Sequence, residues 1–118
     1  MSGRTSRSKG AAGEREAAAC ISDIFGCTSS RGRQYHGGTD SPDVNIGIDG
    51  IHIEVKRVEA LSLYKALDQS RNDAGDKIPL VMHRKNRQPW VFIVEAHRLM
   101  DLVGLLHKEV IEKGVVTQ

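Results

Sequence analysis

Residues 41–57 read SPDVNIGIDGIHIEVKR, and this stretch decides the fold that we expect of the chain. Two largely apolar runs, 43–48 and 51–57, flank an Asp-Gly pair that favours a tight turn. The second run alternates apolar and polar side chains, which is typical of a strand with one face toward a core. The stretch therefore predicts two adjacent strands joined by a hairpin.

The polar face of this predicted hairpin carries the residues of chemical interest. Residues two apart in a strand share a face, so Glu54 and Lys56 point the same way. His52 shares that face, where we expect a neighbour of the site and not a ligand. The hairpin would return Asp43 alongside the Glu54–Lys56 pair. The alternative is a solvated face with a Lys–carboxylate pair, which contributes little.

Two acids and a lysine at one sheet edge indicate a divalent-metal site. Magnesium takes oxygen ligands and commonly only one or two carboxylates, so Asp43 and Glu54 fit, with the carbonyl of Val55 as a further oxygen. Such a metal can activate water against a phosphodiester. Lys56 would orient or deprotonate the water, or offset charge on the phosphorus.

The composition is that of a soluble globular chain, and 118 residues suffice for one domain with a single core. A net charge of +2 says little about partners. The distribution of charge says more, because the basic residues are clustered along the chain. Two cysteines form no disulfide or zinc framework, which favours a reducing, intracellular setting. We expect no membrane span and no signal peptide, and hence a cytoplasmic protein.

Periodicity along the chain predicts a mixed α/β sheet flanked by helices. Residues 1–9 are basic and rich in serine, so we expect a disordered tail before one domain over 10–118. A short strand is expected near 33–35, and Leu61, Tyr64, Leu67 and Ala74 should form the inner face of the second helix. The expected helices are 10–25, 60–74 and 99–112, the first two ended by Gly26 and Gly75, and the further strands are 78–82 and 90–94.

Ser41-Pro42-Asp43 followed by Ile53-Glu54-Val55-Lys56 resembles the PD-(D/E)XK nuclease superfamily. The order of the flanking elements is most similar to the small archaeal and phage Holliday-junction resolvases of that superfamily. The resemblance covers about residues 10–95 and implies a restriction-endonuclease-like core. It implies a magnesium-dependent endodeoxyribonuclease, with Mn²⁺ able to substitute, that leaves a 5′-phosphate. It also implies a homodimer that resolves four-way DNA junctions.

The resemblance adds residues to the site. A glutamate on the first helix joins the metal ligands, and Glu14 holds the matching position, with Glu16 the less suitable choice. Glu14 is equally explained as an acid near a helix N-terminus. Gln69 is the polar residue expected near the site, or else part of an exposed helical face. A serine-bearing loop after the first helix is also implied, and the candidates there are Thr28, Ser29 and Ser30.

Basic residues beside the site suit a DNA backbone. The alternative for 83–87 is an ordinary polar hairpin tip. The residues expected to bind DNA are Arg31, Arg33, Arg84, Lys85 and Arg87. Two other functions stay open: a nuclease of the same fold acting on other DNA structures, and a DNA-binding module without catalysis.

Overall fold

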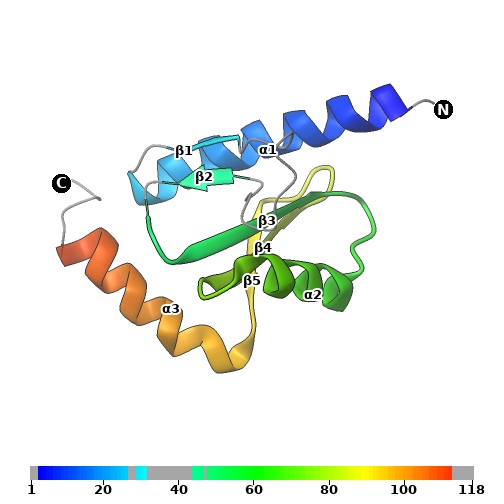
Figure 1. Ribbon diagram of the computed structural model, residues 1–118. Coiled ribbons are helices and arrows are strands. Elements are labelled where there is room, and N and C mark those ends of the chain that lie inside the picture. Colours follow the sequence, from blue (N-terminus) through cyan, green and yellow to red (C-terminus); the bar gives the residue numbers. More distant parts are fainter. Residues whose placement is uncertain (1–2, 27–28, 32–43, 47, 113–118) are drawn as a thin grey trace.

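The structure, a computed structural model, describes residues 3–26, 29–31, 44–46 and 48–112. Groups of strands are separated by helices along the chain, and a three-stranded sheet lies between two of the helices (Figure 1). The elements are α1 (Gly3–Phe25), β1 (Ser29–Arg31), β2 (Val44–Ile46), β3 (Ile51–Arg57), α2 (Leu63–Ala74), β4 (Ile78–Arg84), β5 (Val91–Val94), the 3-10 helix η2 (Ala96–Arg98), α3 (Leu99–Leu106) and the π-helix η3 (His107–Glu112).

The sheet is mixed, as the sequence predicts. β3 and β4 run parallel with α2 as their crossover, and β5 returns antiparallel to β4, giving the order β3-β4-β5. The register places Ile53 opposite Leu80 and Glu54 opposite Val81. A parallel pair needs a crossover connection of this kind, which is why α2 lies between the two strands in the sequence.

The predicted hairpin of β2 with β3 is wrong. β2 pairs with β1 in a separate two-stranded sheet, in which Ser29 lies opposite Ile46. The expected turn does form, and Gly50 adopts a φ of 93° that favours glycine. Its carbonyl, however, accepts a hydrogen bond from the backbone N–H of Ile78 at 2.8 Å. The turn is thereby tied to the start of β4 and does not close a hairpin onto β2.

Both faces of the sheet are covered, by different helices. Ile53 and Leu80 belong to a core cluster with Ala17 and Ile21 of α1, whereas Val81 packs with residues of α2. Because Leu80 and Val81 are adjacent in one strand, they point to opposite faces. α1 and α2 therefore lie on opposite sides of the sheet (Figure 1).

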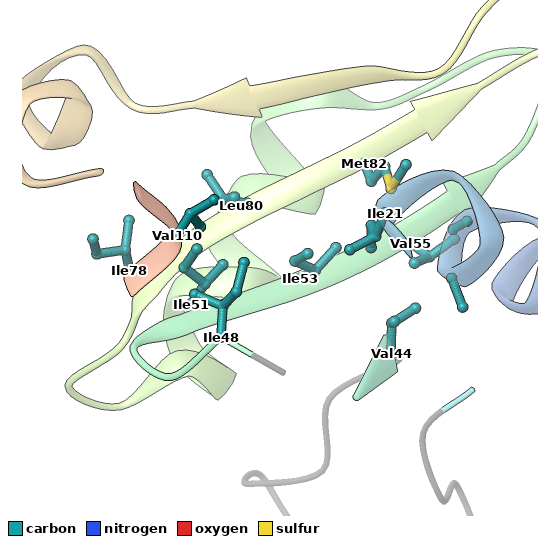
Figure 2. Packing of buried hydrophobic residues seen from close by; sticks show 12 residues of the cluster. Ile21, Val44, Ile48, Ile51, Ile53, Val55, Ile78, Leu80, Met82 and Val110 are labelled. Atoms are coloured by element: carbon teal, nitrogen blue, oxygen red, sulfur yellow. The ribbon is translucent and has the colours of Figure 1, made fainter. Parts of the chain in front are cut away.

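The larger cluster forms the main core of the described residues. In Figure 2, Ile21 lies beside Val55 and Met82, and Val110 from η3 reaches the other end of the cluster. β3 is buried on both faces over its first five residues, so its polar side chains are enclosed as well. The alternation in the sequence therefore separates two buried faces, and not a buried face from a solvated one.

Several boundaries differ from those expected. α1 begins at Gly3, earlier than the expected start at residue 10; the segment lacks proline, and its Arg and Lys residues are good helix formers. α2 begins at Leu63, and Tyr64, expected inside, is 78% exposed. The buried face of α2 consists instead of Ala66, Leu67, Ser70 and Ala74.

The helix ends agree with the prediction. Gly26 and Gly75 follow α1 and α2 with positive φ angles of 69° and 61°, which favour glycine. The predicted strand near 33–35 lies outside the described residues. No helix within the described ranges is both long and apolar enough to cross a membrane.

Candidate metal and phosphate site

Three polar side chains of β3 lie in a row on the face that α2 covers. Glu54 Oε1 lies 3.8 Å from His52 Nε2, and Glu54 Oε2 lies 3.8 Å from Lys56 Nζ. The shared face predicted for these residues is confirmed. The solvated alternative is wrong for Glu54, which is only 4% exposed. Burying a carboxylate costs several kcal/mol unless it is paired, so its place in the fold needs an explanation.

The helix α2 supplies a partner for the lysine. Lys56 Nζ donates a hydrogen bond to Gln69 Oε1 at 3.0 Å, with the lysine side chain 28% exposed. The structure thus brings Gln69 to the lysine, where the resemblance places it. The ammonium is held between a carboxylate and an amide, while part of it still faces solvent.

A second acid of α2, which the sequence analysis missed, also reaches this row. Asp73 lies one helical turn after Gln69, and residues four apart share a helix face. Ligand atoms of His52, Glu54 and Asp73 all lie within 4.8 Å of one another. Two spacings in the sequence indicate this arrangement. Gln69 and Asp73 are four residues apart and so share a helix face, and His52 lies two residues before Glu54 and so shares its strand face.

The imidazole of His52 has an unusual environment. It is 2% exposed, and its Nε2 has no hydrogen-bond partner in the part of the chain that the structure describes. The 3.8 Å to Glu54 exceeds a hydrogen-bond length. A buried polar atom left without a partner costs about 1–3 kcal/mol. His52 is therefore a polar group directed at a carboxylate without bonding it.

The acids of α1 serve different purposes. Glu16 pairs with Arg57 Nε at 3.5 Å and with the Arg84 guanidinium, so it ties α1 to β3 and β4. Glu14 is half-buried and does not belong to the three-residue cluster of the described chain. The sequence prediction of Glu14 as a ligand stays a prediction, and Glu16 is explained by its arginines. Val55 is buried in β3, with its side chain in the main core.

The basic connection between β4 and β5 lies at the Lys56 end of β3, because Lys56 faces His83 and Arg57 faces Arg84 in the register. Arg84 donates hydrogen bonds to Glu16 and to the carbonyl of Gln88, and the DNA contact expected of it stays a prediction. Lys85 and Arg87 are exposed. In this connection, these two side chains are therefore the exposed members of the predicted basic surface.

A hollow of about 180 Å³ adjoins the lysine. Its polar lining includes Lys56, Lys65 and Gln69, with Ser62 at the start of α2. The rest of the lining is apolar, and its two charged residues are both lysines, which favour an anion over a cation in this space. The hollow and the His52–Glu54–Asp73 cluster thus lie on either side of the Glu54–Lys56 pair, with opposite charge preferences.

An ion pair holds α2 in place near the other edge of the sheet. Arg71 donates to Asp68 at 2.7 Å within α2 and to the carboxylate of Glu95, which directly follows β5. The hydrogen bonds that Arg71 donates to Glu95 hold the pKa of the Glu95 carboxyl below its ordinary value, and those that it donates to Glu95 and Asp68 raise the pKa of Arg71. The pair fixes the helix that carries Gln69 and Asp73.

Some predicted site residues cannot be placed. Asp43, Arg33 and Thr28 lie outside the described residues, and Arg31 is the last residue of β1. Comparison of the chain with family models, with curated proteins and with solved structures found no match. The function is therefore argued from the geometry around Glu54 and Lys56.

Proposed function

We propose that this protein is a DNA endonuclease that depends on a divalent metal and has a restriction-endonuclease-like core. The observation that carries the proposal is the chain of contacts from the buried Glu54 carboxylate through Lys56 to Gln69, at 3.8 and 3.0 Å. Glu54 and Lys56 are also the motif residues that resemble the PD-(D/E)XK superfamily. An acid and a lysine side by side suit hydrolysis of a phosphodiester.

The residues suit a divalent cation beside Glu54. A carboxylate at 4% exposure lies beside an imidazole nitrogen that lacks a partner among the described residues, and both groups can donate electron pairs to a cation. Glu54 would hold the ion, with Asp43, the Val55 carbonyl and Glu14 as the further expected oxygen ligands. A bound Mg²⁺, or Mn²⁺ in its place, supplies activation of water and neutralisation of phosphate charge.

Lys56 has the position needed to act on the reacting groups. Its ammonium is kept near the carboxylate by Gln69 and remains partly open to solvent. From there it would orient the attacking water or stabilise negative charge on the phosphate. The amide of Gln69 does not touch the substrate in this scheme; it limits the rotamers that Lys56 can adopt, and so it is a positioning residue.

Phosphates of the substrate would bind near the basic side chains around Lys56. The hollow lined by Lys56 and Lys65 suits one phosphate, and the exposed Lys85 and Arg87 lie toward the same end of β3. Branched DNA as the substrate and a homodimer as the active form rest on the resemblance. A dimer would present one such site to each of two strands.

The test is a cleavage assay on a four-way junction and on a linear duplex of the same sequence, with Mg²⁺, with Mn²⁺ and with a chelator. We expect junction cleavage only with a metal, and a loss of at least about 100-fold in Glu54→Gln and in Lys56→Ala. The matched control is Lys77→Ala, because Lys77 is exposed and precedes Ile78, which faces Ile51 at the end of β3 opposite Lys56. Circular dichroism confirms that each variant folds.

Each outcome decides between functions. Binding of DNA without cleavage under either metal would overturn the proposal in favour of a DNA-binding module. Equal cleavage of junction and duplex would keep the nuclease and remove the junction preference. Full activity in either variant would remove the role assigned to that residue, and an equal loss in Lys77→Ala would mean that the effect is not local.

A further inference from the structure

We propose that His52, Glu54 and Asp73 form a binding site for a transition-metal ion of the Zn²⁺ type. The three side chains come from β3 and α2, and their ligand atoms lie within 4.8 Å of one another. This donor set differs from the oxygen ligands expected of the nuclease centre, because it contains an imidazole nitrogen and an acid from the second helix.

The buried imidazole is the independent sign of a ligand. His52 Nε2 is enclosed, has no hydrogen-bond partner in the described part of the chain, and points at the carboxylate of Glu54. Buried polar atoms are nearly always hydrogen-bonded, so an atom that is not requires a reason. A metal ion between the nitrogen and the two carboxylates would satisfy it.

The spacing suits a metal better than a hydrogen bond. Zinc binds nitrogen and oxygen at about 2.0–2.2 Å in a tetrahedral arrangement, which sets neighbouring ligand atoms about 3.4 Å apart. The 3.8 Å between His52 Nε2 and Glu54 Oε1 is close to that value. Asp73 is only half-buried, so it can close the remaining gap by a change of rotamer and leaves a path by which an ion can enter.

The donor types determine which ion is favoured. Imidazole nitrogen suits zinc and related transition ions, whereas magnesium prefers oxygen and gives up its waters reluctantly. With three protein ligands, a fourth position stays open to water. The site shares Glu54 with the proposed nuclease centre, but binding at it does not require that the protein cleave DNA.

The experiment is metal binding by the full chain, without DNA. Protein stripped with a chelator is titrated with ZnCl₂ and with MgCl₂ by calorimetry, and Co²⁺ is added as a spectroscopic probe. We expect one Zn²⁺ per chain, much weaker binding of Mg²⁺, and visible Co²⁺ bands typical of four-coordinate geometry. His52→Gln and Asp73→Asn should each weaken Zn²⁺ binding at least about 10- to 100-fold.

The matched control is His107→Gln, since His107 is exposed in η3, pairs there with Glu112 and does not belong to the cluster. It should bind Zn²⁺ like the wild type. Absence of Zn²⁺ binding in the wild type would overturn the site, as would unchanged affinity in both His52→Gln and Asp73→Asn. If His52→Gln fails to fold, Asp73→Asn alone decides. A chain that binds Zn²⁺ but cleaves no DNA would keep this site and remove the proposed nuclease.

Discussion

α1 approaches β3 closely at Gly13, and replacing this residue with alanine tests the packing. A Cβ at Gly13 would lie 2.6 Å from the Cβ of Arg57 and 3.1 Å from its Cγ. The Arg57 Cβ is fixed by the backbone of a paired strand, so it cannot move away as the tip of a flexible side chain can. The substitution therefore forces the helix from the sheet.

Two effects of opposite sign determine the result of Gly13→Ala. In a helix interior alanine is favoured over glycine by about 0.8–1.0 kcal/mol. Overpacking a well-packed contact costs about 1–3 kcal/mol. The net change in the free energy of unfolding thus lies between about zero and a loss of about 2 kcal/mol, although helix propensity alone predicts a gain.

Gly104 provides the matched control, since it also lies within a helix, but a Cβ added there would meet no heavy atom of the described residues within 4 Å. Gly104→Ala should stabilise the protein by about 1 kcal/mol. Urea unfolding followed by circular dichroism measures both variants against the wild type, and they should differ by about 1–3 kcal/mol. Equal stabilisation by the two substitutions would refute the close contact between α1 and β3.

Three further predictions concern α2. Gln69→Ala releases the ammonium of Lys56 and should lower junction cleavage about 10- to 100-fold, measured under single-turnover conditions; an unchanged rate would mean that the amide does not position the lysine. Arg71 lowers the pKa of Glu95, so the ion pair between the two residues stabilises the fold at neutral pH. This stabilisation is lost as the pH falls through the lowered pKa of Glu95. Glu95→Gln should therefore lower the Tm at pH 7 and approach the wild type in acid, and a constant difference across pH would contradict this. Ser70 is fully buried and donates a hydrogen bond to the carbonyl of Leu80 in β4 at 2.9 Å. Ser70→Ala should therefore lower the free energy of unfolding in urea by about 1 kcal/mol, and an unchanged value would mean that this hydrogen bond does not stabilise the fold.

Local signals in the sequence predict most of the secondary structure. The glycines after α1 and α2 end both helices, and the apolar runs that become β4 and β5 lie at nearly the expected places. The pairing of β2 with β1, and the hydrogen bond that ties Gly50 to Ile78, could not be predicted, because both join segments that are distant in the chain. Turn chemistry indicates that the chain bends there, but not which strand it meets.

The candidate site also combines residues that local sequence signals predict with residues that only the fold brings together. Glu54 and Lys56 share a face because of strand alternation, which is a local property. Asp73 joins them because α2 packs across that face; its spacing from Gln69 indicates a shared helix face, but not which strand that face meets. Arg84 shows the reverse case, since its sequence neighbourhood suggests DNA binding whereas the fold uses it to hold Glu16.

The burial of Glu54 is not explained by stability. At 3.8 Å and an effective dielectric constant of about 20, its attraction to Lys56 is about 4 kcal/mol. Removing a carboxylate from water costs several kcal/mol, which offsets this attraction, and a neutral side chain of similar size would avoid the cost. His52, placed beside it without a hydrogen bond, adds a further cost. Two unfavourable placements on one strand face, both directed at the same space, are better explained by a positively charged ligand than by packing.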